Sequence, residues 1–116
     1  MILAVLDDLM FASKIRTTAA QVGIDVTFAR SADAALAEMR NARPALVILD
    51  LNNQRINPLS IVRSMKQDPA LTSVPTVGYA SHVQTDVINA ARQAGVDDVL
   101  PRSAFATRLS EILRRA

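Results

Sequence analysis

The sequence predicts an α/β fold in which strands and helices alternate and the strands form one parallel sheet. Two observations carry this prediction. Short apolar runs are separated by segments whose apolar residues recur at helical spacing. The clearest run covers residues 45–49 and ends on the carboxylate of Asp50, as expected for a central strand that is buried on both faces.

The apolar runs place five strands along the chain. The predicted strands cover residues 2–6, 25–29, 45–50, 75–80 and 96–100. Short connections through alternating helices imply right-handed crossovers, with helices on both faces of the sheet. The chain contains no internal repeat, linker or low-complexity segment. We therefore expect residues 1–116 to form a single domain with no output domain attached.

Each predicted helix carries a stripe of apolar residues. The stripes are Phe11, Ile15, Ala19 and Val22; Leu36 and Met39; Leu59, Val62 and Met65; Val83, Val87, Ala91 and Ala94; and Phe105, Leu109, Ile112 and Leu113. Gly23 and Gly95 close the first and fourth of these helices. Ser31 is expected to cap the second helix, and Asn57 the third, with Pro58 as its first residue.

The composition argues against several classes of site. The chain has no cysteine, which excludes disulfides and thiolate metal sites and fits a reducing compartment. No apolar run approaches the length of a membrane span, and the N-terminus lacks the basic region of a signal peptide. We therefore expect a cytoplasmic protein without membrane contact. The net charge is only +2, and no nucleic-acid-binding motif is present.

Polar residues gather where the predicted strands end. In a parallel sheet the carboxyl ends meet at one edge, where open α/β sheets bind ligands. The residues collected there are Asp7, Asp8, Asp50, Ala80, Ser81 and Arg102. Carboxylates from two strands suit a hard cation such as Mg²⁺, and Asp50 can then act as a nucleophile on a phosphoryl group. An ordinary charge pair of Asp7 and Arg102 with Asp50 explains the same spacing equally well.

The chain resembles the receiver domain of two-component response regulators over essentially its whole length. The segments that carry the resemblance are Asp7-Asp8, residues 46–51, Val74-Pro75 and residues 94–100. The resemblance implies a flavodoxin-like (βα)5 fold with the strand order 2-1-3-4-5. It also implies a role in signal reception or relay within a two-component phosphorelay.

The resemblance assigns a role to each residue of the site. Asp50 would accept a phosphoryl group from a histidine kinase or a phosphotransfer protein, so that any enzyme activity is at most self-catalysed transfer to Asp50. Asp7, Asp8, Asp50 and the backbone carbonyl of Asn52 would hold Mg²⁺. Arg102 stands where the family has a lysine that contacts the phosphoryl oxygens. A downstream protein would bind the face made by the last two helices and the fifth strand.

The chain departs from the family pattern at the metal site. When Phe11 and Ile15 are matched to the core positions of the family's first helix, Leu6 falls on the first acid and Asp7 on the second. Only one helper carboxylate is then in register, although Asp8 can substitute. We therefore predict weak binding of Mg²⁺, since each lost carboxylate removes a charged ligand.

Further departures concern the residues that contact the phosphoryl group in the family and those that couple phosphorylation to a conformational change. The family's hydroxyl residue on the fourth strand falls on Ala80, and Ser81 would face the opposite side of the strand. The aromatic switch position falls on Val99. Arg102 keeps the positive charge of the lysine but presents a planar fork. We predict that its guanidinium lies within hydrogen-bonding reach of Asp50 in the unmodified protein.

Two functional hypotheses follow. The first is a phosphoacceptor at Asp50 that uses Mg²⁺. The second is a degenerate pseudo-receiver that acts as a phosphorylation-independent interaction module. A small flavodoxin-like enzyme or nucleotide binder is disfavoured because no glycine-rich loop follows the first strand. Of the remaining polar residues, His82 is predicted to lie in a surface loop, and Tyr79 is predicted to be a core residue of the fourth strand.

Overall fold

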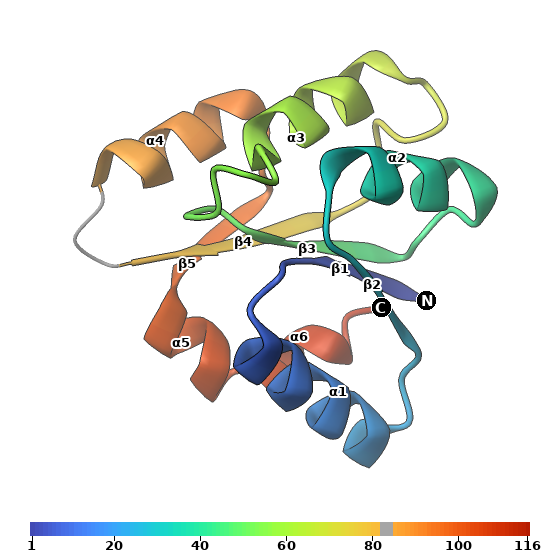
Figure 1. The fold of residues 1–116 in the computed structure, drawn as a ribbon, viewed down its shortest axis with the longest axis vertical. Coiled ribbons are helices and arrows are strands. Elements are labelled where there is room, and N and C mark those ends of the chain that lie inside the picture. Colours follow the sequence, from blue (N-terminus) through green and yellow to red (C-terminus); the bar gives the residue numbers. More distant parts are fainter. Residues whose placement is uncertain (82–84) are drawn as a thin grey trace.

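Five parallel strands form one sheet in the order β2-β1-β3-β4-β5 in the computed structural model, which describes residues 1–81 and 85–116 (Figure 1). The strands are β1 (Ile2–Val5), β2 (Val26–Ala29), β3 (Leu46–Asp50), β4 (Thr76–Ala80) and β5 (Asp98–Pro101). The predicted flavodoxin-like fold and its strand order are therefore confirmed.

Helices cover both faces of this sheet. They are α1 (Leu9–Val22), α2 (Ala32–Asn41), α3 (Pro58–Gln67), α4 (Thr85–Ala94), α5 (Arg102–Thr107) and α6 (Leu109–Leu113). In Figure 1, α2, α3 and α4 lie above the sheet, and α1, α5 and α6 lie below it. Among the described residues, no helix has both the length and the apolar character needed to cross a bilayer.

The central strand β3 is buried along its whole length. Side chains of a strand point alternately to opposite faces, and β3 supplies both core layers in this way. Leu46 and Ile48 pack with the layer of α1, α5 and α6. Val47 and Leu49 pack with the layer of α2, α3 and α4. The apolar run in the sequence is thus explained by a strand that has helices on both sides.

The helix ends differ in how well the sequence predicted them. The Ser31 hydroxyl accepts a hydrogen bond from the Ala34 N–H, which confirms the predicted cap of α2. Gly23 ends α1 in the left-handed region, with φ of 72°. Asn57 precedes Pro58 as predicted, but its side chain makes no cap hydrogen bond, and its own φ is 52°. A capping residue usually has an extended backbone, which Asn57 does not have.

The C-terminal part of the chain differs from the prediction in two ways. We expected one final helix, whereas the chain forms α5 and α6, which are separated at Arg108. The fifth strand also lies slightly later than expected, at Asp98–Pro101, so that α5 begins directly at Arg102. Two predicted features, the loop position of His82 and the helical position of Val83, lie outside the described residues.

Candidate functional site

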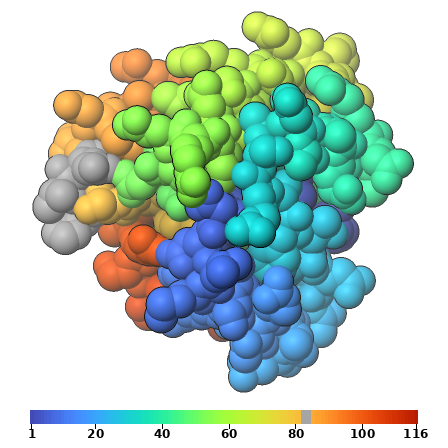
Figure 2. Space-filling view, viewed as in Figure 1, coloured from blue at the N-terminus to red at the C-terminus, as the bar shows by residue number. Residues whose placement is uncertain are grey.

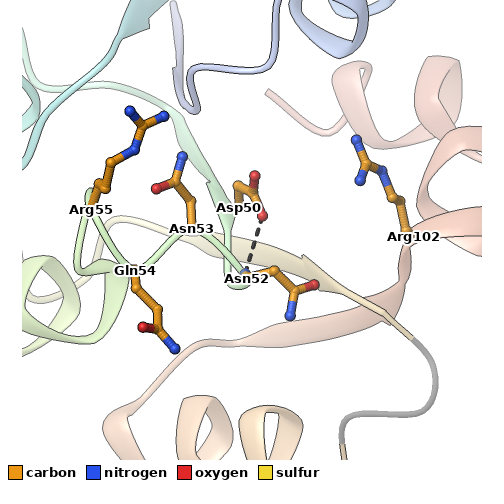
Figure 3. Close-up of a pocket in the computed structure, with 6 residues that line it drawn as sticks. All are labelled: Asp50, Asn52, Asn53, Gln54, Arg55 and Arg102. Carbon is orange, nitrogen blue, oxygen red and sulfur yellow. Dashed lines mark hydrogen bonds between the residues drawn. The ribbon is translucent and has the colours of Figure 1, made fainter.

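Asp50 is the last residue of β3, at the carboxyl edge of the sheet. It is paired in register with Tyr79 of β4, and its side chain is only 9% exposed. Its Oδ1 atom accepts a hydrogen bond of 3.1 Å from the Asn52 N–H (Figure 3). Burial raises the pKa of the Asp50 carboxyl group, and the Asn52 N–H opposes this shift. Asp50 is therefore a carboxylate held in a poorly solvated position.

A cleft of about 450 Å³ opens in front of this carboxylate. Its lining residues come from the end of β3, the loop after it and the start of α5: Asp50, Asn52, Asn53, Gln54, Arg55 and Arg102 (Figure 3). In Figure 2 the green segment that contains this loop borders the blue N-terminal segment at the surface. The cleft therefore lies where the predicted site residues were expected to meet.

Asp7 follows β1 and is held by the loop after β3. Its Oδ1 atom accepts a hydrogen bond of 2.7 Å from the side-chain amide of Asn53. Its Oδ2 atom forms a salt bridge with the guanidinium of Arg55. Both oxygens of this carboxylate are thus engaged by residues that lie more than 40 positions away in the sequence.

Asp8 is the N-cap of α1. Its Oδ1 atom accepts hydrogen bonds from the N–H groups of Met10 and Phe11, at 3.0 and 3.2 Å. Its Oδ2 atom accepts a hydrogen bond of 2.6 Å from Arg102. These bonds, led by that from Phe11, lower the pKa of Asp8. The carboxylate that we expected to substitute at the metal site is therefore used to start a helix.

The predicted hydrogen bond between Arg102 and Asp50 is wrong. Arg102 donates to Asp8, and no hydrogen bond joins it to Asp50 in Figure 3. Asp8 offers Arg102 an oxygen that the helix cap leaves open. The Arg102 guanidinium carbon also lies 4.7 Å from the centre of the Phe11 ring and 5.8 Å from that of Tyr79, where cation–π attraction adds to the pairing.

Asn52 ties the ends of two strands together. Its N–H binds Asp50, and its side-chain oxygen accepts a hydrogen bond of 2.7 Å from the Ser81 N–H. This bridge fixes the loop after β3 against the end of β4. It also keeps the backbone of Asn52 beside Asp50, where its carbonyl was predicted to serve as a metal ligand.

Three apolar residues occupy positions that the family pattern gives to polar or aromatic ones. Val5 pairs with Leu49, so Leu6 and Asp50 come next on these two strands, and Leu6 is buried among apolar side chains. Ala80 and Val99 are buried in the opposite core layer, with α3 and α4. Ala80 offers no hydroxyl and Leu6 no carboxylate, so the site lacks both groups.

Sequence reasoning missed two features of the site. Arg55 was not singled out, because a loop arginine carries no signal of the distant acid that it binds. Tyr79 was predicted as a core residue, and it is 1% exposed. Its hydroxyl, however, has no hydrogen-bond partner within residues 1–81 and 85–116. A phenol at a buried strand position next to Asp50 is the signal that could have revealed it.

The oxygen donors suit Mg²⁺ in kind but not in their present arrangement. Within the described part of the chain, no group of three or more acidic, histidine or cysteine side chains is placed to hold a metal ion. Asp7 and Asp8 are each paired with an arginine. Asp7 and Asp50 can supply two carboxylates to one cation only if Arg55 and Asn53 release Asp7.

A doubly wound parallel sheet, with acidic residues following β1 and ending β3, places this chain among the open α/β domains whose ligands bind at the carboxyl edge of the sheet. The sequence profile of the response regulator receiver domain matches residues 2–114. The chain belongs to this family, as its resemblance in the sequence predicted.

Individual relatives agree with this assignment. The chain is 33% identical over 96 residues to the nitrogen assimilation regulatory protein NtrX of Azorhizobium caulinodans. This match covers 81% of the chain but only 21% of the relative, so the chain spans about a fifth of that protein. The crystal structure of the receiver domain of NtrX from Brucella abortus is 26% identical, with a TM-score of 0.84, and 99% and 96% of the two chains are covered.

A phosphorylated response regulator is also similar in structure. The crystal structure of the phosphorylated cyanobacterial phytochrome response regulator RcpA is 25% identical to the chain, with a TM-score of 0.81. The match covers 97% of this chain and 87% of that one. These matches therefore extend over almost the full length of the chain.

Proposed function

We propose that this receiver domain accepts a phosphoryl group on Asp50. The observation that carries the proposal is the difference between Asp50 and the two acids that follow β1. Asp7 and Asp8 each form a salt bridge with an arginine of the chain. Among the hydrogen bonds of the described residues, only that from the Asn52 N–H reaches the Asp50 carboxylate, which lines the cleft. Asp50 is thus the acid best placed to act as a nucleophile.

The proposed reaction is transfer from a phosphohistidine of a histidine kinase or a phosphotransfer protein. An anionic oxygen of Asp50 forms a bond to phosphorus as the phosphorus–nitrogen bond breaks. The electron pair of the broken bond stays on the imidazole nitrogen. The reaction needs the ionised carboxylate, so protonation of Asp50 stops it. Arg102 lines the same cleft and can bring positive charge to the phosphoryl oxygens.

Asp7, Asp50 and the carbonyl of Asn52 would hold Mg²⁺ in this proposal, and Asp8 would join them only on release from Arg102. A bound Mg²⁺ would reduce the electrostatic repulsion between the Asp50 carboxylate and an incoming phosphoryl group. The chain's own residues set the condition for binding, since Arg55 and Asn53 must leave Asp7 first. We therefore expect weak binding of Mg²⁺.

The proposed setting is a cytoplasmic two-component system. The downstream partner would bind the face made by β5, α4 and the C-terminal helical segment, which the structure divides into α5 and α6. We also propose that residues 1–116 act as one domain. Because the match covers only 21% of the curated relative, the output that this domain controls is to be identified by experiment.

A second candidate function is supported by the departures at the site. Ala80 has no hydroxyl, Val99 is not aromatic, and the acids after β1 are paired with arginines. A receiver with these features can act as an interaction module that does not require phosphorylation. The two candidates differ in one measurable property, the reactivity of Asp50.

Intact mass after incubation with acetyl phosphate and Mg²⁺ separates the two candidates. We expect the wild-type chain to gain the mass of one phosphoryl group. The Asp50→Asn variant keeps the shape of the side chain and should gain none. An unchanged wild-type mass would reject the phosphoacceptor proposal and favour the interaction module.

A further inference from the structure

Tyr79 carries a buried hydroxyl group whose presence the packing does not explain. Its ring forms a three-ring cluster with Phe11 and Phe105, whose ring centres each lie 4.8 Å from that of Tyr79 and 5.7 Å from one another. The hydroxyl has no hydrogen-bond partner among residues 1–81 and 85–116. Leaving a buried donor unpaired is unfavourable, and a phenylalanine would fill the same space without this penalty. The packing of the described residues therefore leaves this hydroxyl free to donate to a group that arrives at the site.

The position of Tyr79 in the sheet indicates where that partner would be. Tyr79 and Asp50 are register partners on β4 and β3. Two residues earlier, Val77 and Ile48 are also register partners, and both pack with the layer of α1, α5 and α6. Side chains alternate along each strand, so Asp50 and Tyr79 project on that same face, from strands about 4.8 Å apart. A group added to Asp50 would thus enter the neighbourhood of the phenol.

The charge around Tyr79 favours its role as a donor. Burial, followed by the negative charge of Asp50, raises the pKa of the phenol above its usual value, so the hydroxyl keeps its proton at neutral pH. Arg102 lies over the Phe11 and Tyr79 rings, so the cation of the cleft and the phenol are on the same side of Asp50. An anion on Asp50 would meet both of them.

We propose that the Tyr79 hydroxyl donates a hydrogen bond to the phosphoryl group on Asp50. It would replace the hydroxyl that Ala80 cannot provide, from the neighbouring position and the opposite face of β4. The proton stays on Tyr79, which takes no covalent part in the transfer. The inference rests on the proposed function, because it needs an anionic group on Asp50.

The test compares Tyr79→Phe, which removes only the hydroxyl, with the wild type. The probe is beryllium fluoride with Mg²⁺, and its affinity is measured by titration calorimetry or amide NMR. A hydrogen bond to a charged acceptor is strong enough that its loss should weaken binding about ten- to a hundredfold. Without the probe, Tyr79→Phe should unfold at the same or a higher urea concentration, since a buried unpaired donor is removed.

Ser81→Ala is the matched control, because it removes the other hydroxyl next to the site. The Ser81 contact to Asn52 is made by its backbone N–H and survives the substitution. We expect this variant to bind the probe like the wild type. Tyr79 is the only tyrosine of a chain without tryptophan, so a red shift of its absorption on addition of the probe reports the new hydrogen bond directly in the wild type.

The outcomes separate this inference from the proposal on which it rests. If the wild type neither binds the probe nor becomes phosphorylated, both proposals fail together. If the wild type binds and Tyr79→Phe binds equally well, the Tyr79 inference alone is overturned. It is also overturned if Ser81→Ala is the variant that loses affinity, or if Tyr79→Phe is less stable without the probe, because the hydroxyl would then have a partner already.

Discussion

Each acid that follows β1 is held by an arginine from elsewhere in the chain. Arg55, from the loop after β3, binds Asp7, and Arg102, the first residue of α5, binds Asp8. The Arg55 guanidinium therefore binds the Asp7 oxygen that a metal ion would need as a ligand. Because the Arg55 side chain is 83% exposed, this contact is weak enough to be exchanged.

Removal of the Arg55 charge should favour the metal. We expect Arg55→Gln to bind Mg²⁺ up to about fivefold more tightly than the wild type, since an exposed ion pair contributes at most about 1 kcal/mol. Amide shifts of Asp7 and Asp50 during a Mg²⁺ titration measure this. Arg63→Gln removes the charge of another exposed arginine and should have little effect. Saturation of the wild type at sub-millimolar Mg²⁺ would contradict the predicted weak binding.

The raised pKa of Asp50 leads to a prediction about stability and pH. The folded state disfavours the charged form, so the ionised carboxylate lowers stability at neutral pH, and this penalty disappears as the pH falls through the folded pKa. We expect Asp50→Asn to be more stable than the wild type at pH 7 and to lose this advantage as the pH approaches 3.8.

Urea unfolding of both proteins across this pH range measures the difference. Asp25→Asn, at an exposed position outside the cleft, is the control and should show no such advantage. A stability difference between Asp50→Asn and the wild type that stays constant down to pH 3.8 would show that burial of Asp50 is not its cause.

At the scale of the elements, the Asp8 side chain connects α1 to α5. It caps the first turn of α1 and binds Arg102, the first residue of α5. Asp8→Ala removes both interactions and should lower the free energy of unfolding by about 1–2 kcal/mol, mostly through the lost cap. Asp8→Asn keeps a capping oxygen and should lose less than about 1 kcal/mol.

Denaturant unfolding tests this order of stabilities, with Ser31→Ala as the reference. Ser31 is an uncharged cap of α2, so this variant removes a cap hydrogen bond alone. It should lower the free energy of unfolding by about 1 kcal/mol. If Asp8→Asn were as unstable as Asp8→Ala, the salt bridge with Arg102 would be the main contribution of Asp8, against our account.

The elements were largely predictable from the sequence, whereas the contacts between them were not. Apolar periodicity located each strand, because burial on both faces leaves a run such as residues 46–49 without polar breaks. The position of Asp50 followed from the end of that run. The partner of Arg102 depended on the rotamer of a long side chain and on an acid 94 positions away, so local spacing could not reveal it.

At the scale of the molecule, the chain lacks the two groups through which the family pattern couples the site to a distant face. Ala80 has no hydroxyl to move towards a phosphoryl group, and Val99 is too short to alternate between inward and outward positions. A ligand shifts a conformational equilibrium only by its different affinity for the two states. That difference should be small here.

We therefore expect beryllium fluoride to cause amide shifts near the site and few at Val99 or along residues 105–113. Amide spectra with and without the mimic test this expectation, and Asp50→Asn serves as the control without a binding site. Large shifts along residues 105–113 would mean that this chain switches by another route, for example through the Arg102 contact with Asp8.

The central claim is that Asp50, and no other acid of the site, accepts the phosphoryl group. An acyl phosphate is reduced by borohydride to an alcohol, which converts a phosphorylated aspartate into homoserine. After treatment with acetyl phosphate and Mg²⁺, reduction and peptide mass spectrometry should find homoserine at position 50 alone. Homoserine at position 7 or 8, or at no position, would contradict the account.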